Sequence, residues 1–195
     1  MVKKSFFAIV LIIGFQSVAQ AQDFSDRSGL LKANLSFNQG FMLFQKSQNV
    51  YLGGNLEYFP SKNISIRGDC FWYLDSRREN PVLKQSTLVF FGALFHLPKG
   101  KNDFYTGIQP GFAFTRPALL SLVTDRSYPM RMMPSLALSL GYSFYFSRFC
   151  NFFVGANYFV LRYRGAENGS LKLDEFMISG GLGFHIKVKK QKPVN

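Results

Sequence analysis

The chain has 195 residues, enough for one domain, and carries 23 Lys and Arg against 11 Asp and Glu residues, a formal net charge of +12. Its two cysteines are too few for a disulfide framework. The basic residues are scattered and form no stripe, so the charge favours anionic lipid head groups or glycans as neighbours and argues against nucleic acid.

The N-terminal segment MVKKSFFAIVLIIGFQSVAQAQ has the features of a secretory signal peptide. Lys3 and Lys4 precede an apolar run, and Ala19 and Ala21 are the small residues of a cleavage site. The expected signal peptide therefore covers residues 1–21. Its apolar run is shorter than the ~20 residues that a transmembrane helix needs.

Eight segments of alternating large apolar and small or polar residues follow, separated by turn-forming residues. The predicted strands are residues 30–41, 50–59, 64–75, 87–97, 104–116, 135–146, 152–163 and 176–188. No helical period competes with this alternation.

The connectors between these strands alternate in length. The short ones are residues 60–63, 98–103 and 147–151. The long ones are residues 76–85, 117–134 and 165–174, and only the first connector, 43–49, is intermediate. Short turns at one end and long loops at the other are typical of outer-membrane barrels, in which the short turns are periplasmic. An even number of strands then places both termini in the periplasm.

The segment ALSLGYSFYF, residues 137–146, indicates which strand face meets lipid. Leu138 and Leu140 share one face, and Ser139 and Gly141 share the other. A water-facing surface would favour Thr, Lys, Glu and Arg, because glycine and serine weaken strands. Small residues suit the crowded interior of an eight-stranded barrel, with the large apolar residues facing lipid.

Aromatic residues near strand ends on the apolar face are a second indication, since they resemble the aromatic girdle of a membrane barrel. They include Tyr58, Phe104, Phe146 and Phe152. The sequence therefore predicts an all-β fold, an eight-stranded antiparallel up-and-down transmembrane β-barrel over residues 22–188, followed by a basic periplasmic tail at 189–195. A soluble periplasmic β-sandwich with a Phe-rich core is the open alternative.

No catalytic, cofactor-binding or metal-ligating motif is present in the sequence. The two histidines, His96 and His185, fall near the expected periplasmic rim, far from the outer leaflet. Cys70 and Cys150 have no ligand-like spacing and are expected to be free thiols. We therefore expect a protein that is not an enzyme, and an outer-leaflet lipid-modifying enzyme is an alternative.

Several charged and polar residues are expected to face the lumen, where buried charges must be paired and hydrogen-bonded. This predicted lumen network consists of Lys32, Asn55, Glu57, Arg67 and Asp69. Glu57 and Arg67 flank the turn 60–63 at positions that are opposite or one diagonal step apart, and they are expected to form an ion pair. The network either fills the barrel or lines a narrow path, so a narrow porin for small solutes is a second alternative.

The longest connector, residues 117–134, mixes leucine and methionine with arginine. Loops of this length are usually functional or disordered, so a binding loop and a mobile, solvated loop are both open. The predicted binding residues of this connector are Arg126, Tyr128, Met130 and Arg131. A surface glycan, a lipid head group or a partner protein would suit this composition.

Three segments carry a resemblance to a known family: LEYFPSKNISIRGD, HLPKGKNDFYTGIQPGFAFTR and the final GGLGFHIKV. With the N-terminal signal, they resemble the outer-membrane protein β-barrel domain family, including small porin-like, OmpX-type and PorT-like barrels of Bacteroidetes-type Gram-negative bacteria. The resemblance implies a protein of the cell outer membrane. From the residues themselves we expect a structural, adhesive or partner-binding role and a mostly filled lumen. Outer-membrane lipid and lipopolysaccharide would be its immediate partners.

Overall fold

The computed structural model describes residues 27–77, 81–118, 128–166 and 169–188. The expected signal peptide, Arg126 and the basic tail lie outside these residues. The strands are β1 (Leu30–Met42), β2 (Ser47–Tyr58), β3 (Ile64–Ser76), β4 (Leu83–Lys99), β5 (Asn102–Pro117), β6 (Arg131–Tyr145), β7 (Cys150–Val160), β8 (Arg162–Ala166), β9 (Gly169–Lys172) and β10 (Glu175–Lys187). No helix in the described part of the chain is long and apolar enough to cross a membrane.

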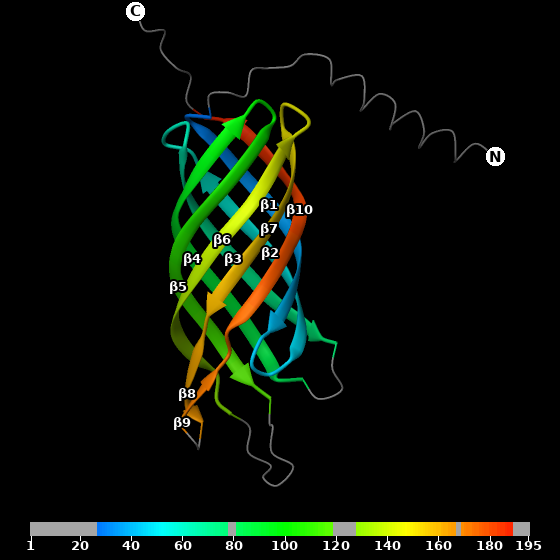
Figure 1. Cartoon of the computed structure of the whole chain (residues 1–195), viewed down its shortest axis with the longest axis vertical. Coiled ribbons are helices and arrows are strands. Elements are labelled where there is room, and N and C mark those ends of the chain that lie inside the picture. The colour runs from blue at the N-terminus through cyan, green and yellow to red at the C-terminus, as the bar shows by residue number, and fades with distance from the viewer. Residues whose placement is uncertain (1–26, 78–80, 119–127, 167–168, 189–195) are drawn as a thin grey trace, which may run out of the picture.

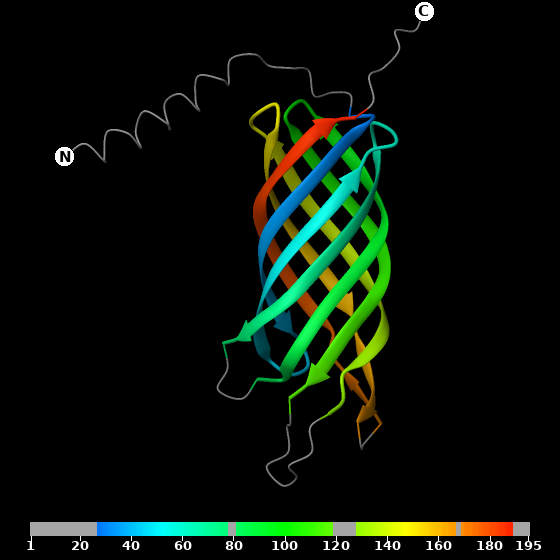
Figure 2. The same cartoon turned by 180° about the vertical axis from the view of Figure 1, so that it is seen from behind.

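Eight of these strands close into one antiparallel barrel in the order β1-β10-β7-β6-β5-β4-β3-β2, with tilted strands that wrap around a common axis (Figures 1 and 2). Each of the eight barrel strands pairs with the next barrel strand along the chain, so that β7 pairs with β10, and β10 also pairs with β1 to close the barrel. The predicted fold class, an eight-stranded up-and-down barrel, is confirmed. β8 and β9 form a separate hairpin that projects from the barrel (Figure 1).

The two ends of the barrel differ in their connections. Residues 59–63, 100–101 and 146–149 join strands at what we call the turn end, next to Arg27 and Val188. The connection 100–101 is tight because Gly100 has a φ of 59°, which L-residues rarely adopt. The chain passes from β1 to β2, from β3 to β4, from β5 to β6 and from β7 to β10 at the opposite end, which we call the loop end.

Several strand boundaries at the loop end differ from the prediction, three of them substantially. β4 begins at Leu83 and β6 at Arg131, both four residues earlier than expected, so Arg131 belongs to a strand and not to a loop. The expected seventh strand, 152–163, breaks at Val160, and the β8–β9 hairpin occupies its last residues and most of the expected long loop 165–174. The break follows from Asp174, whose carboxylate accepts a hydrogen bond from the Leu161 backbone N–H at 2.9 Å and turns the chain out of the barrel.

The outer wall of the barrel is apolar, as the alternation predicts. Leu140 is 62% exposed, whereas its neighbour Ser139 is 3% exposed and faces the lumen. The expected girdle residues Tyr58, Phe104, Phe146 and Phe152 are all exposed. Such a continuous apolar belt is far larger than a soluble monomer exposes, and it fits contact with lipid. The β-sandwich alternative was wrong.

Glycines on the lumen face make room for large side chains. Tyr105 on β5 stands directly opposite Gly141 on β6, and a Cβ at residue 141 would overlap the Tyr105 ring. A Cβ at Gly53 would come within 2.7 Å of the Phe71 ring. The small residues of the alternating pattern are therefore a condition of lumen packing. Cys70 and Cys150 are free thiols on strands that do not pair.

Candidate functional site

The lumen near the turn end is filled by ionisable side chains that we call the charged cluster: Arg27, Lys32, Glu57, His96 and Asp103. None is more than 1% exposed. Arg27 Nη1 lies 2.5 Å from Asp103 Oδ2, and Lys32 Nζ forms an ion pair with Glu57 Oε2. His96 lies between the two carboxylates, with Nε2 3.1 Å from Glu57 Oε1 and Nδ1 2.9 Å from Asp103 Oδ2. Each charge thus has an opposite charge beside it, which burial requires.

Aromatic rings enclose the charged cluster. The guanidinium of Arg27 lies 4.5 Å from the centre of the Tyr145 ring, and Lys32 Nζ lies 5.6 Å from the centre of the Phe59 ring. Cations are attracted to ring faces, and the attraction grows when water is absent. These contacts fix the positions of the cations and fill the space between them.

Part of the charged cluster has the connectivity of a hydrolase triad. Ser65 Oγ lies 2.8 Å from His96 Nε2, and His96 Nδ1 lies 2.9 Å from Asp103 Oδ2. However, Ser65 donates its own hydroxyl hydrogen to Glu57 Oε1 at 2.6 Å, so it does not offer that proton to the histidine. Ser65, His96 and Asp103 are each 0% exposed. A nucleophile needs room for its substrate, so the arrangement suits packing and not acyl transfer.

A second polar network crosses the middle of the lumen, centred on Asp69. Arg67 Nε donates to Asp69 Oδ2 at 2.9 Å, and Gln109 Nε2 donates to the same oxygen at 2.5 Å. Ser139 Oγ donates to Gln109 Oε1 at 2.8 Å. The network therefore ties β3 to β5 and β6 across the interior.

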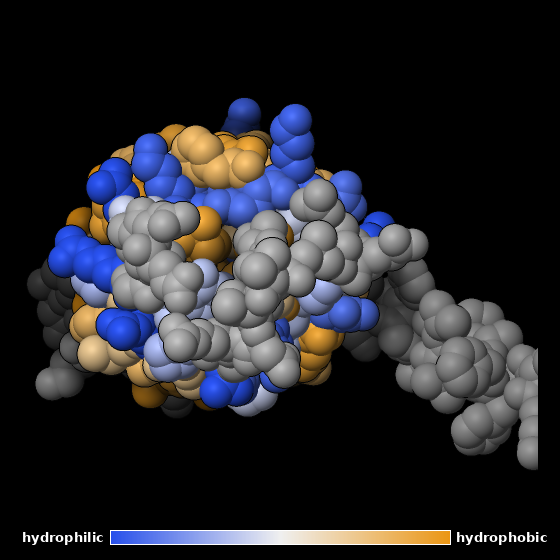
Figure 3. Space-filling view, turned by 90° about the horizontal axis from the view of Figure 1, so that it is seen from below, coloured by the Kyte–Doolittle hydropathy of each residue, from blue (hydrophilic) through white to orange (hydrophobic). Residues whose placement is uncertain are grey.

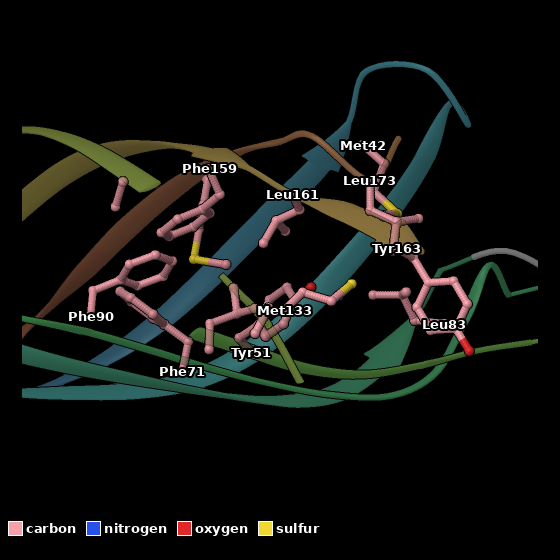
Figure 4. Close-up of a cluster of buried hydrophobic side chains, with 14 of the residues drawn as sticks. Met42, Tyr51, Phe71, Leu83, Phe90, Met133, Phe159, Leu161, Tyr163 and Leu173 are labelled. Atoms are coloured by element: carbon pink, nitrogen blue, oxygen red, sulfur yellow. The ribbon is translucent and has the colours of Figure 1, made fainter. Parts of the chain in front are cut away.

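Beyond this network the lumen becomes apolar toward the loop end. The rings of Phe71, Phe90 and Phe159 meet there, with Phe90 stacked on Phe159 at 4.9 Å between ring centres and Phe71 edge-on to Phe159 at 5.5 Å (Figure 4). Further apolar side chains extend from these rings toward the loop-end mouth of the barrel. We call this set the apolar plug: Met42, Tyr51, Phe71, Leu83, Phe90, Met133, Phe159, Leu161, Tyr163, Leu173 and Met177.

Glu175 is the acidic side chain buried beside the apolar plug. Tyr51 Oη donates to its Oε2 at 2.7 Å, and Asn49 Nδ2 donates to its Oε1 at 2.8 Å. The side chain packs over Gly40, where no larger residue would fit. These contacts connect β10 to β2 at the loop end.

One small cavity lies in the middle of the lumen. This cavity, of about 10 Å³, lies between Arg67, Asp69, Tyr105 and Phe153. That volume holds about one water molecule and is no continuous path. Charged, mixed polar and apolar layers thus fill the barrel in series.

The structure places all five members of the predicted lumen network on the lumen side of the barrel, but they do not form one network. Lys32 and Glu57 belong to the charged cluster, whereas Arg67 and Asp69 belong to the middle network. Asn55 accepts a hydrogen bond from Asn34 at 2.6 Å. Glu57 and Arg67 are direct cross-strand partners as expected, but the expected ion pair between them was wrong.

The predicted lumen network did not include three members of the charged cluster: Arg27, Asp103 and His96, which was expected only near the periplasmic rim. His96 and Asp103 stand at inward positions of β4 and β5, so the alternating pattern could have identified them. Arg27 precedes β1, and no periodicity reaches it.

The described residues of the predicted binding loop do not act as one exposed unit. Tyr128 is half-buried and packs edge-on against Tyr163, with ring centres 6.1 Å apart. Tyr163 in turn donates its hydroxyl to the Pro129 carbonyl at 2.8 Å. Met130 and Arg131 are exposed. Among the described residues, Tyr128 therefore closes over the apolar plug, whereas Met130 and Arg131 face outward. In the described part of the chain, no group of histidine, cysteine or acidic side chains is arranged to hold a metal ion.

No protein-family model and no curated protein sequence matches this chain. Solved structures do match it. Neisserial surface protein A is 13% identical with a TM-score of 0.61, covering 80% of this chain and 97% of that one. The outer membrane protein OprG from Pseudomonas aeruginosa is 10% identical with a TM-score of 0.58, covering 86% and 100%. The N-terminal β-barrel domain of Pseudomonas aeruginosa OprF is 19% identical with a TM-score of 0.53, covering 82% and 98%. The chain therefore has the fold of the small outer-membrane β-barrels.

Proposed function

We propose that this protein is an integral outer-membrane β-barrel that conducts no solutes and serves a structural or partner-binding role through its loop end. The observation that carries the proposal is the filled lumen, with the charged cluster and the apolar plug in series. An ion would lose its water at the apolar plug without gaining a partner, and it would have to break buried ion pairs at the charged cluster. The same filling makes the barrel a rigid support for its loops.

The orientation follows from the two unlike ends. Short turns face the periplasm in outer-membrane barrels, and longer loops face the outside. The turn end would then lie in the periplasm with both chain termini, and the loop end would present the β8–β9 hairpin and residues 128–130 to the surroundings. Adhesion to a surface glycan or association with a partner protein would use this end.

The same geometry argues against a hydrolase. The triad-like Ser65 is buried at the turn end and gives its proton to Glu57. A lipid-modifying barrel enzyme needs its nucleophile open to the outer leaflet. We therefore assign Ser65, His96 and Asp103 to packing of the lumen.

The proposal is tested by conductance in planar bilayers. The mature protein, refolded and inserted from detergent, is expected to give no steady channel current, while an open porin inserted under the same conditions supplies the positive control. A variant with both Phe71→Ala and Phe159→Ala retains the charged cluster and is also expected to stay closed. Large, stable channels from the wild-type protein would contradict the filled lumen and favour the narrow porin.

A further inference from the structure

β6 and β7 separate near the loop end. Their pairing stops at Leu136 opposite Val160. Beyond this point β6 continues to Arg131 paired with β5, whereas the chain after Val160 enters β8, which pairs with β9. A groove of about 550 Å³ opens on the outside of the barrel between the diverging strands. Its volume is in the range of small-molecule sites.

The groove has an apolar floor and a basic rim. Met132, Leu136 and Val160 line it on the side of the barrel wall, and Arg131, Arg162 and Arg164 line it toward the loop end. All three arginines are exposed. Within the described residues, the ion pairs involve other side chains, and none joins these arginines to a carboxylate.

The groove lies where the apolar belt ends. On β7 the outward positions run from Phe152 through Val154 to Val160, and the next outward position is Arg162. On β6 the outward apolar face ends at Met132, next to Arg131. In a membrane this boundary is the level at which acyl chains meet head groups, and long basic side chains extend from it toward water.

The rest of the loop end adds positive charge around the groove. Hydrophilic residues surround this end of the barrel, with hydrophobic residues between them (Figure 3). The exposed basic residues there include Lys46, Arg77, Lys84 and Lys172. Of the acidic residues described at this end, Asp75 is exposed, whereas Asp174 and Glu175 are buried. The field at the groove therefore favours an anion.

We propose that this groove binds the phosphorylated head group of an outer-leaflet glycolipid, the lipid A portion of lipopolysaccharide. Arginine pairs with phosphate through two parallel hydrogen bonds, so Arg131, Arg162 and Arg164 provide sites for two phosphates. An acyl chain lies along Met132, Leu136 and Val160. The inference rests on the proposed outer-membrane location, and it gives the loop end a specific lipid partner.

The test uses the refolded mature protein in detergent micelles and native mass spectrometry with purified bisphosphoryl lipid A. A triple variant, Arg131→Gln, Arg162→Gln and Arg164→Gln, is expected to lose about tenfold or more in its affinity for lipid A. Each basic residue near an anionic surface contributes to the binding free energy, and this variant removes three of them. The matched control removes three positive charges at the turn end, by Lys62→Gln, Lys99→Gln and Arg148→Gln, and is expected to bind as the wild type does.

Lipids of different head-group charge distinguish site binding from general attraction. Lipid A without its phosphates and phosphatidylethanolamine are expected to bind weakly to every variant. Equal affinity for dephosphorylated lipid A, or an equal loss in both triple variants, would overturn the proposal. A soluble sulfated oligosaccharide that displaced lipid A completely, with a matching affinity, would instead assign the arginines to a glycan. The conductance experiment does not depend on lipid binding. A negative result for lipid A would therefore reject the proposed lipid site without contradicting the proposal that the barrel conducts no solutes.

Discussion

Glu57 forms its ion pair with Lys32, its cross-strand partner on β1, and not with Arg67, which stands directly opposite it on β3. Both oxygens of Glu57 are occupied, since Oε1 accepts a hydrogen bond from Ser65 and lies beside His96, while Oε2 faces Lys32. Arg67 turns instead to Asp69 on its own strand. The strand register places two cations, Lys32 and Arg67, opposite Glu57. The hydrogen bonds of the surrounding side chains determine that Lys32 forms the ion pair.

This pairing predicts strong coupling between Lys32 and Glu57. Lys32→Met alone is expected to lower the free energy of unfolding by about 3 kcal/mol, because Glu57 loses its main counter-charge in a buried site. The double variant Lys32→Met and Glu57→Gln is expected to lose less than the sum of the single losses. A double-mutant cycle by urea unfolding in detergent measures this coupling.

The matched control is the cycle of Glu57→Gln with Arg67→Met. Its coupling is expected to be smaller than that of Glu57 with Lys32, because Arg67 remains tied to Asp69 in the wild type. Larger coupling to Arg67 than to Lys32 would mean that the charged cluster is arranged differently from the structure described here.

The lipid-facing wall predicts a dependence on depth along β6. Leu140 and Met132 share one face of this strand and are 62% and 61% exposed, but Leu140 lies near mid-strand and Met132 near the loop end. Leu140→Arg is expected to destabilise the barrel by about 2 to 4 kcal/mol, and Met132→Arg by about 0 to 1 kcal/mol. Unfolding titrations in lipid vesicles compare the two. Equal, small losses would indicate a wall that faces water.

The packing of Tyr105 over Gly141 predicts a second contrast. Gly141→Ala would force the Tyr105 ring to move and is expected to cost about 1 to 3 kcal/mol, as overpacking of a filled interior does. Gly180→Ala is the control, because a Cβ there meets nothing within 4 Å. Urea unfolding followed by gel mobility gives both values. A tolerated Gly141→Ala would show that the lumen is looser than the structure indicates.

Ser65 is expected to be chemically inert despite its neighbours His96 and Asp103. A fluorophosphonate probe should leave the folded barrel unlabelled, because the hydroxyl is buried and donates to Glu57. Intact-mass measurement after incubation checks this, with a serine hydrolase as the positive control. Stoichiometric labelling that Ser65→Ala abolishes would reopen the enzyme alternative.

Most of the barrel was predictable from the sequence because strand alternation has only two faces to assign. Alternation assigns the outward face to Leu140, Leu52 and Ile178 and the inward face to Ser139, Tyr51 and Met177. Once the face of one residue in a strand is known, the faces of its neighbours follow. The β8–β9 hairpin was not predictable in this way. Alternation continues through Tyr163, while the break depends on a hydrogen bond from Leu161 to Asp174, far along the chain.

The interior was only partly predictable, for a related reason. The inward direction of Lys32, Glu57 and Arg67 follows from alternation, but their partners depend on distances across a closed barrel. His96 meets Glu57 from two strands away, because β2 and β4 both border β3. The groove at Arg162 likewise exists because the chain separates from β6 after Val160 and enters β8. No local sequence pattern indicates this separation.

Carbonate extraction followed by gel electrophoresis is the most direct test of whether the protein is a lipid-embedded barrel. Membranes from cells that make the mature protein are washed with alkaline carbonate, and the pellet is run in SDS with and without boiling. We expect the protein to stay in the pellet and the unboiled sample to migrate as a compact folded species, distinct from the boiled one. Release into the carbonate wash, with identical mobility of both samples, would contradict a membrane-spanning barrel.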